Sequence, residues 1–550
     1  MGRHLLYVWV PDAPPNMLGK WPPASLYASS ELKGIFSMST TATTSATHPK
    51  WQALTERVCE ASTLGSCASV LHWDQETKMP PEGIEPRGRQ IALIAKLAHE
   101  LGTSQEVGEL LAACEADDDL VSDPNSDTAV TLERLRHDYD RATCIPSALV
   151  SEEALLASTA QHNWAESRRN DDFTQFQPYL EQVVALLRQK AKCYGWAEGG
   201  EPWDALAEDY EPGCTAAWVE SVFTPLRDRL QSLLDRLMGS STPPSNAFNE
   251  LCLPIEKQEA FVTDVAASIG FDFQRGRIDV STHPFCTGFH PKDVRITTRF
   301  HKNNVNDALG STMHECGHAI YEQGLRQDNA GLPLGSSVSL GIHESQSRLW
   351  ENQVGRSHQF WQWCFPKLGK YFGSDVSALD IDGVYHGANI VRPDFIRVEA
   401  DEATYNMHIM IRFEIERALL KGELEVADVP AAWAEKYREY LSIDVPCDSK
   451  GCLQDIHWSM VSMGYFPTYT LGNLYSAQFF DAAKREMPGL EDGFAKGEFE
   501  PLKTWLNEKI HQQGRRHLPA DLCEVVTGAP LSADHLMNYL ETKLGGIYGL

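Results

Sequence analysis

The sequence predicts an all-α protein, mostly helical, with one small β-ribbon. Apolar residues recur at three- and four-residue spacing over long stretches, which is the pattern of amphipathic helices, and clusters of Gly, Pro and Asp separate these stretches. Hydrophobic residues make up 42% of the 550 residues, which is ample for a large buried core. No apolar run approaches the length that a membrane span needs, so we expect a soluble globular protein.

Several stretches show the helical pattern clearly. In one of them, Asn306 or Asp307 is suited to cap the start of the helix, and Gly324 is suited to end it. A further run begins at Ile342 and returns after a Gly- and Ser-rich loop, so we expect it to pack antiparallel to the preceding helix. The expected helices cover residues 173–195, 215–238, 307–323, 342–350, 400–421 and 430–440.

Residues 277–300 depart from the helical pattern. Ile278 and Val280, then Val294 and Ile296, alternate with polar residues around a turn-rich centre, which predicts a small β-ribbon. An exposed ribbon edge can hold an extended peptide by main-chain hydrogen bonds.

Charge and cysteine usage exclude several classes of protein. The net charge is −28, from 76 acidic and 48 basic residues, which argues against nucleic acid or an anionic membrane as a partner because both require a basic surface. The 13 cysteines are odd in number and have no repeating spacing. A disulfide framework is therefore not expected, and a reducing compartment, the cytoplasm, is favoured.

The run from His314 to His318 carries the strongest chemical signal. On a helix, two histidines four residues apart present both imidazoles to one metal ion, and Glu315 lies beside them where it can reach a metal-activated water. The alternative is a pair of buried core histidines on an amphipathic helix. Within the run, Cys316 is interpreted as a small core residue and not as a thiol nucleophile. The pattern favours a zinc peptidase site.

Catalytic zinc usually has three protein ligands and leaves one position open to water. Glu322 lies one further turn along the same helix, too far from a metal that His314 and His318 already hold. Glu344 follows the loop of residues 331–341 and begins the returning helix, so it is the predicted third ligand. His343 is the competing ligand, but a carboxylate fits the two-His, one-Glu set of peptidase zinc better.

Six short motifs follow one another along the chain. They are His283-Pro284-Phe285, Asp293-x-Arg295-x-Thr297, His314-Glu315-x-x-His318, His343-Glu344-Ser345-Gln346-Ser347, Ile396-Arg397-x-x-Ala400-Asp401 and Gly451-x-x-Gln454-Asp455-x-His457-Trp458. In this order they resemble the carboxypeptidase Taq family of zinc metallocarboxypeptidases, and residues 71–81 resemble the N-terminal region of that family. The likeness runs from about Trp51 to the C-terminus.

The resemblance implies a zincin-type peptidase with a mostly helical fold around a deep substrate groove. It further implies a homodimer with one Zn²⁺ in each subunit, Co²⁺ or another divalent ion being the alternative. The implied substrates are peptides with a free C-terminal carboxylate, from which single amino acids are released with broad specificity and with poor cleavage next to proline.

Three residues are assigned to the chemistry of peptide hydrolysis. Glu315 is the expected general base, which takes a proton from the attacking water and passes it to the leaving amine. The oxyanion that develops needs a hydrogen-bond donor, and Tyr465 is the first candidate, with Tyr469 second.

An exopeptidase of this kind must also bind the C-terminal carboxylate, for which a bidentate arginine is suited. Arg397 is the first candidate, and Arg392 is close enough in sequence to be confused with it. The resemblance implies that Gln454 and His457, three residues apart on an expected helix, contact the substrate. Arg295, on an alternating strand, is predicted to contact substrate or to form a structural ion pair.

Two other functions fit parts of the pattern. A different zinc peptidase, such as an oligoendopeptidase or a dipeptidyl carboxypeptidase, would share the metal site and accept other substrate lengths. A non-catalytic peptide-binding protein would share the fold, but such a protein has no reason to keep Glu315 together with all three metal ligands.

Residues 1–48 are expected to lie outside the folded domain. Prolines interrupt the start of this segment, and residues 39–47 are nearly all Ser, Thr and Ala, which is a flexible composition. Translation that starts at Met38 would explain the segment, and a transit peptide is the alternative. Residues 49–550 are expected to form a single catalytic domain.

Overall fold

The computed structural model describes residues 48–550, so the expectations for the N-terminal segment and for a start at Met38 fall almost entirely outside the described residues. The described chain is mostly helical, as predicted. Its helices are α1 (Pro49–Thr77), α2 (Ile84–Gly102), α3 (Gln105–Glu115), α4 (Asp118–Val121), α5 (Asp127–Thr143), α6 (Ser147–Asn170), α7 (Phe173–Tyr194), α8 (Pro202–Ala207), α9 (Ala216–Met238), α10 (Ile255–Ser268), α11 (Val305–Gly324), α12 (Leu340–Arg348), α13 (His358–Phe372), α14 (Ile381–Ala388), α15 (Tyr405–Lys421), α16 (Val429–Leu441), α17 (Pro467–Glu486), α18 (Leu490–Phe494), α19 (Glu500–Lys509), α20 (Pro519–Thr527) and α21 (Ala533–Tyr548).

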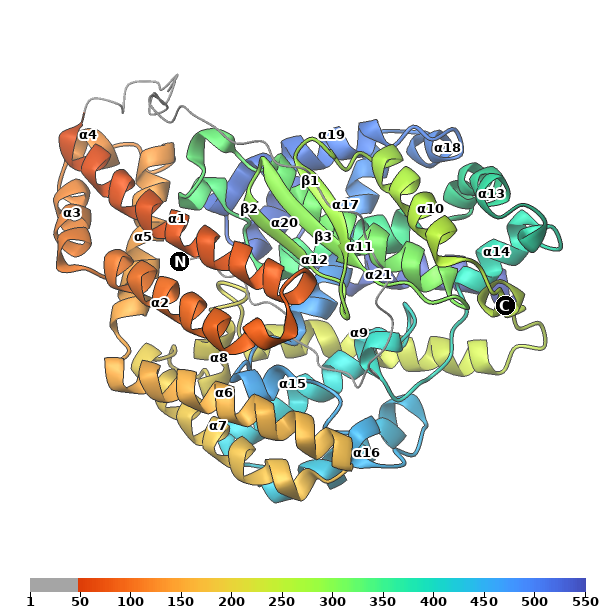
Figure 1. The fold of residues 1–550 in the computed structure, drawn as a ribbon, viewed down its shortest axis with the longest axis horizontal. Helices are drawn as coiled ribbons and strands as arrows, with labels where there is room; N and C mark the ends of the chain where they lie inside the picture. The colour runs from red at the N-terminus through yellow and green to blue at the C-terminus, as the bar shows by residue number, and fades with distance from the viewer. Residues whose placement is uncertain (1–47) are drawn as a thin grey trace.

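The helix α17 is the central element of the fold. Its residues are almost all buried, which is the mark of a helix surrounded by other elements. It packs against α12, α15, α20 and α21. The pair α1 and α2 forms a helical hairpin at the N-terminal side of the molecule (Figure 1). In the part of the chain that the structure describes, no helix is both long and apolar enough to cross a bilayer.

The small sheet has three strands, β1 (Gly276–Val280), β2 (Cys286–His290) and β3 (Asp293–Thr298), in the order β1-β3-β2. The two predicted runs pair in parallel, with Ile278 opposite Ile296, and β2 pairs with β3 in the antiparallel direction. The turn-rich centre of the predicted ribbon thus contains a strand that the sequence pattern did not reveal. The strand β3 packs against α11 and carries the sheet to the side of that helix.

The predicted helix boundaries were confirmed in most places. The helix α11 starts at Val305, two residues earlier than expected, because the side chain of Asn304 caps it by accepting a hydrogen bond from the backbone of Asp307. The helix α12 ends at Arg348 and continues as a π-helical segment, Leu349–Val354.

Two predictions of helix were wrong. Residues 400–404 are not helical, because the Asp401 carboxylate accepts hydrogen bonds from the backbone of Ala403 and Thr404 and caps the turn before α15 begins at Tyr405. The segment that contains Gln454 is a series of turns, and His457 begins a 3₁₀ helix of four residues. Gln454 and His457 therefore do not share one face of an α-helix.

Two glycines allow α12 to lie unusually close to its neighbours on both sides. A Cβ atom on Gly317 of α11 would lie 2.5 Å from the carbonyl oxygen of Gln346 and 2.6 Å from the Cα atom of Ser347. A Cβ atom on Gly472 of α17 would lie 2.5 Å from the Cγ atom of Glu344. Such distances are shorter than carbon atoms tolerate, so only glycine fits at these two positions. The helix α12 is thereby fixed between α11 and α17.

We expect the substitution Gly317→Ala to push α12 away from α11 and to lower the free energy of unfolding by about 1–3 kcal/mol, the usual cost of overpacking. Chemical denaturation measures this change. Gly310→Ala on the same helix is the matched control, because a Cβ atom there meets no atom within 4 Å and alanine favours helix by about 1 kcal/mol over glycine. Equal stability of the two variants would contradict the close-packing argument.

Candidate functional site

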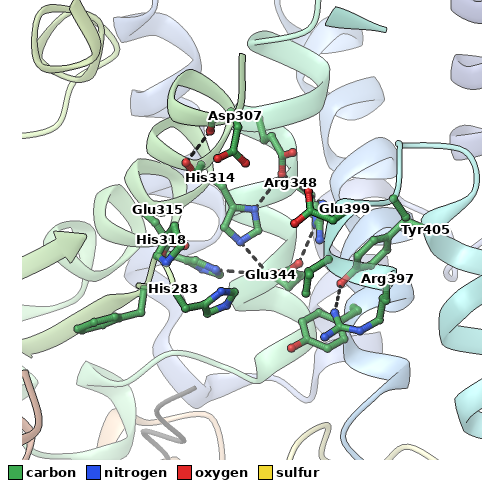
Figure 2. A pocket seen from close by; sticks show the side chains of 18 of the residues that line it. His283, Asp307, His314, Glu315, His318, Glu344, Arg348, Arg397, Glu399 and Tyr405 are labelled. Carbon is green, nitrogen blue, oxygen red and sulfur yellow. Dashed lines mark hydrogen bonds and ion pairs between the residues drawn. The ribbon is translucent and has the colours of Figure 1, made fainter. Parts of the chain in front are cut away.

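A pocket of about 670 Å³ opens beside α11 and α12. Its walls come from the segment before β2 and from β2 itself, from α11, from the start of α12, from residues 387–401 and from the start of α17. Figure 2 shows labelled side chains from the segment before β2, from α11, from α12 and from residues 397–405 around a common space. The pocket brings together residues that lie up to about two hundred positions apart in the sequence.

His314, His318 and Glu344 converge at the wall of this pocket (Figure 2). The Oε2 atom of Glu344 lies 3.6 Å from Nε2 of His314 and 3.4 Å from Nε2 of His318. One atom from each of the three side chains lies within 4.8 Å of the others. The two histidines lie one turn apart on α11, and the close approach of α12 brings the carboxylate to them.

The three side chains fit a divalent metal ion. Two imidazole nitrogens and one carboxylate oxygen are the ligand set of catalytic zinc in peptidases. Among the described residues, these three side chains form the one such group, and all three line the pocket. Burial lowers the pKa of His318 to about 3, which keeps its imidazole neutral, as a metal ligand must be.

A second layer of charged residues holds this group in place. Burial alone would raise the pKa of the Glu344 carboxyl, but Arg348 and His314 hold that pKa well below its usual range, so the side chain is ionised. Arg348 donates to Glu344 over 2.7 Å and to Glu351 over 3.2 Å. Glu351 in turn lies 2.9 Å from Nδ1 of His314, and Arg356 donates to it over 3.0 Å.

Sequence reasoning missed Arg348 and Glu351. Arg348 follows Glu344 by four residues, which is the spacing of a helical ion pair, so the pair could have been predicted from the sequence. Glu351 lies seven residues after Glu344, and it sits in the π-helical segment that follows α12. Because π-turns break the regular helical spacing and often occur at functional sites, this placement was harder to foresee.

His343, the competing ligand, and Glu322, which was expected to lie too far along α11, both lie outside the group of three. Nδ1 of His343 lies 2.6 Å from Nδ1 of His318, the ring nitrogen that does not face Glu344. Nε2 of His343 lies 2.9 Å from the carboxylate of Glu322. His343 and Glu322 therefore lie behind His318, and neither joins the three side chains that converge.

Glu315 lies in the pocket wall and is only 6% exposed. Its burial raises the pKa of its carboxyl to about 7, and the nearby His314 opposes this shift. A carboxyl group with a pKa near 7 can both take up and release a proton at neutral pH, which suits a general base. Cys316, in contrast, is fully buried in the core, and burial raises the pKa of its thiol well above the usual range, as expected for a structural cysteine.

Both candidate arginines line the pocket but differ in their surroundings. Arg397 is buried; its guanidinium donates to the Asp455 carboxylate over 2.8 and 2.9 Å and to the Tyr405 hydroxyl over 2.9 Å. The side chain of Arg392 is 78% exposed and lies 3.4 Å from Asp394. Arg397 is thus held by buried partners, whereas the side chain of Arg392 is exposed to solvent.

Four further predicted residues divide between the pocket and its support. Tyr465 and Tyr469 line the pocket, whereas Gln454 and His457 do not. The side-chain oxygen of Gln454 accepts a hydrogen bond from the backbone of Arg397, so this amide fixes the segment that carries the arginine. Nε2 of His457 lies 3.3 Å from the hydroxyl of Tyr469.

Arg295 lies outside the pocket lining. It donates a hydrogen bond to the Asp293 carboxylate over 2.9 Å. Its Cζ atom lies 4.4 Å from the centroid of the Trp73 ring and 4.9 Å from that of the Phe289 ring. These contacts join β3 to α1. Arg295 was predicted either to contact substrate or to form a structural ion pair, and in the structure its contacts are those of an ion pair.

His283 and Arg299 line the pocket without having been assigned a role from the sequence. Burial lowers the pKa of His283 to about 4, so this imidazole is neutral near pH 7. Arg299 donates to Asp307 over 2.8 Å and lies 3.6 Å from Glu399, which approaches from the opposite wall. His283 belongs to the first of the six motifs, so the sequence already marked this residue as a candidate for the site.

The chain is similar in sequence to known carboxypeptidases. The family model described as Carboxypeptidase Taq (M32) metallopeptidase matches residues 53–544. Thermostable carboxypeptidase 1 of Thermus thermophilus is 44% identical over 507 residues, which cover 91% of this chain and 99% of the relative. Carboxypeptidase 1 of Bacillus subtilis is 36% identical over 481 residues, which cover 87% of this chain and 95% of the relative.

Solved structures agree with this similarity. The crystal structure of an M32 carboxypeptidase from Deinococcus radiodurans superposes with a TM-score of 0.88 at 40% identity, covering 92% of this chain and 100% of that chain. Metallocarboxypeptidase 1 of Trypanosoma cruzi superposes with a TM-score of 0.84 at 32% identity, covering 90% and 99% respectively.

The ion pairs of Asp455 lead to a pH-dependent prediction. Burial opposes ionisation of this carboxyl, but Arg397 and Arg412 hold its pKa well below the usual range. We expect Asp455→Asn to lower the free energy of unfolding by about 3–5 kcal/mol at pH 7, because it leaves buried arginines without their partner. Urea denaturation between pH 7 and pH 3 measures this difference.

The sign of the pH dependence follows from the depressed pKa. The contribution of Asp455 is complete above about pH 3.9, the pKa of an unfolded aspartate, and shrinks by about 1.4 kcal/mol per pH unit below it. The difference between wild type and variant should therefore narrow in acid. Asp444→Asn is the control, since Asp444 is 81% exposed in its pair with Arg438 and the change should have little effect. A constant difference at all pH values would contradict the role of the Asp455 charge.

Proposed function

Because the chain belongs to the carboxypeptidase Taq (M32) family of metallopeptidases, and is therefore a metallocarboxypeptidase, we propose that it is a zinc enzyme with His314, His318 and Glu344 as ligands. The observation that carries this proposal is the convergence of two Nε2 atoms and one carboxylate oxygen at the pocket wall. Two nitrogen ligands and one carboxylate suit zinc, and Co²⁺ is the first alternative to test.

We propose that Glu315 is the general base. A bound zinc ion would supply a Lewis acid that lowers the pKa of a water molecule and polarises the scissile carbonyl. Glu315 lies next to His314 in sequence and lines the same pocket, so its carboxylate can take the proton from the attacking water. The same carboxyl then gives the proton to the leaving amine.

The oxyanion that forms at the scissile carbonyl needs a donor, and we propose Tyr465 for this role, with Tyr469 as the second candidate. Both tyrosines line the pocket, Tyr465 from the segment just before α17 and Tyr469 from the first turn of that helix. The hydroxyl of Tyr469 is already close to His457, whose position therefore influences how this tyrosine points. Tyrosine hydroxyls are suitable donors because they are neutral and remain protonated at pH 7.

We propose that Arg397 binds the C-terminal carboxylate of the substrate. Its planar guanidinium has five N–H donors, so it can keep its bonds to Asp455 and Tyr405 and still turn an N–H toward the pocket. Gln454 supports it indirectly by holding its backbone. Arg392 is the alternative, and its exposure would require it to become ordered when substrate binds.

The edge of β2 is suited to hold the peptide main chain. Residues Cys286, Thr287 and Gly288 line the pocket, and β2 is an outer strand of the sheet. We propose that an extended substrate adds to this edge by main-chain hydrogen bonds. For Arg295, substrate contact rests only on the resemblance of its motif, and we assign it to the support of β3.

The proposal also covers the oligomeric state, the compartment, the specificity and the domain organisation. We propose a cytoplasmic homodimer that releases single residues with broad specificity, on the strength of the family resemblance and the reduced cysteines. Residues 49–550 would be one catalytic domain, since one large core extends from Leu149 to Tyr548 and a smaller N-terminal cluster packs beside it. The helix α2 presents exposed Ile84, Leu93 and Leu97, an apolar surface of the kind that a second subunit covers.

The mode of cleavage can be tested with a peptide of about ten residues in free-acid and C-terminally amidated forms, incubated with zinc-loaded enzyme and followed by mass spectrometry. We expect a ladder of single C-terminal losses from the free acid only. Internal cuts, or losses of two residues at a time, would assign the enzyme to the endopeptidase or dipeptidase class. Absence of cleavage would favour a peptide-binding protein.

The role of Glu315 predicts that Glu315→Gln keeps the metal and loses the chemistry. The three ligands remain, so the zinc content of the purified variant should equal that of wild type. Without the base, kcat should fall by about 10²–10⁴-fold. Wild-type activity in a variant with full zinc content would exclude Glu315 as the base.

The two arginines can be separated by peptide binding in the inactive Glu315→Gln background. We expect Arg397→Lys to weaken the free-acid peptide about tenfold or more and to leave the amidated peptide unchanged, because lysine keeps the charge opposite Asp455 but loses the guanidinium fork. Arg392→Ala should have little effect on either peptide. If only Arg392→Ala removes the preference for the free acid, the carboxylate is bound by Arg392.

A further inference from the structure

His343 and Glu322 form a largely buried chain at the pocket wall, next to one of the proposed metal ligands. Nδ1 of His318 lies 2.6 Å from Nδ1 of His343, and Nε2 of His343 lies 2.9 Å from Oε1 of Glu322. The side chains of His343 and Glu322 are 17% and 11% exposed. Neither residue belongs to the three side chains that converge, and neither has a part in the proposed chemistry.

The positions of the protons in this chain follow from its two ends. Oε1 of Glu322 lies within hydrogen-bond distance of Nε2 of His343 and can accept there, so we assign an N–H to Nε2 of His343. With its N–H at Nε2, His343 has a lone pair at Nδ1 that accepts a hydrogen bond. The short contact between the two Nδ1 atoms requires one proton, which must come from His318. The Nε2 atom of His318, which faces Glu344, is left with its lone pair free for a metal ion.

We propose that Glu322 and His343 act as a relay that holds His318 in the tautomer and orientation that bind the metal. The proposal rests on the metal site proposed above and deepens it. If the protons were reversed, Nδ1 of His318 would accept from His343 and its Nε2 would carry the proton. A protonated Nε2 cannot bind a metal ion, so the direction of this relay decides whether the site can form.

The fold builds this relay from three elements. His318 and Glu322 lie one turn apart on α11, and His343 lies next to Glu344 at the start of α12. The same helix therefore supplies a metal ligand and the partner of another ligand. On the far side, a Cβ atom on Gly288 would lie 2.5 Å from Oε2 of Glu322, so the backbone of β2 closes over the carboxylate.

The two histidine ligands are held in different ways. His314 has a carboxylate, Glu351, directly at its Nδ1 atom. His318 has the imidazole of His343 at the equivalent place, and the carboxylate of Glu322 lies beyond that imidazole. Loss of such outer partners typically weakens metal binding by about 10–100-fold. We expect a loss of this size when the acceptor on His343 is removed.

The test uses two substitutions of the same residue. His343→Asn keeps an acceptor close to the position of Nδ1, because the side-chain oxygen of asparagine can occupy that place. His343→Leu has a similar size and no acceptor. The dissociation constant for Zn²⁺ is measured by competition with a chelating indicator, and the melting temperature of each metal-free protein is measured in parallel.

We expect His343→Leu to raise the Kd for Zn²⁺ by about 10–100-fold and His343→Asn to restore most of the affinity. A purely structural role would move the melting temperatures and leave the two variants alike in zinc affinity. Equal loss in both variants would overturn the relay, because the zinc affinity would then not depend on an acceptor at the position of Nδ1. Wild-type affinity in His343→Leu would overturn it as well.

Two substitutions of Glu322 provide an independent test in case a His343 variant does not fold. Glu322→Gln keeps an oxygen that accepts from His343, whereas Glu322→Met has similar length and no acceptor. We expect the Met variant to lose more zinc affinity than the Gln variant. In the double variant of His343→Leu and Glu322→Met the losses should not add, because both substitutions break one relay.

Zn²⁺ binding by the wild-type protein shows whether the relay alone is wrong or the metal site as well. If wild type binds no Zn²⁺, the proposed site itself is wrong and the relay with it. If wild type binds Zn²⁺ and the variants of His343 and Glu322 bind it equally well, the metal site stands and only the relay is wrong.

Discussion

The close packing of α12 between α11 and α17 is the constraint on which the site depends. Gly317 and Gly472 have no side chain at the two points of contact, and this allows the carboxylate of Glu344 to reach the histidines of α11. A methyl group at either position would enter the space of α12. Because α17 is buried on nearly all sides, α12 has no room to retreat. The geometry of the three converging side chains is therefore a property of the core.

The same packing concentrates charged side chains in a largely buried region at the pocket wall. Glu344 and Glu351 are buried carboxylates, and Arg348 lies between them as a shared partner. On the other wall, Asp455 pairs with Arg397 and Arg412. Buried charges are tolerated when they are paired and hydrogen-bonded, and removal of one partner is costly. Such networks hold side chains in fixed positions, which a catalytic site needs more than it needs stability.

Much of the fold and of the site could be predicted from the sequence, where the information was local. Helical spacing identified α11 and the pair His314 and His318, and the return of the chain after a glycine-rich loop identified Glu344 as the third converging residue. Features that depend on contacts distant in sequence could not be predicted. The strand β2 exists because it pairs with β3, and Gly472 meets Glu344 from 128 positions away. The turns around Gln454 replaced an expected helix because its side-chain amide bonds to backbone carbonyls, including those of Phe395 and Gly451.

Anomalous X-ray scattering at the zinc absorption edge, from crystals of the zinc-loaded protein, would locate the metal ion. We expect one strong peak at about 2.0–2.2 Å from Nε2 of His314, Nε2 of His318 and the Glu344 carboxylate, with His343 not in contact with the metal. A peak bound to His343 or to Glu322, or no peak near α11, would contradict both the proposed metal site and the relay that supports it.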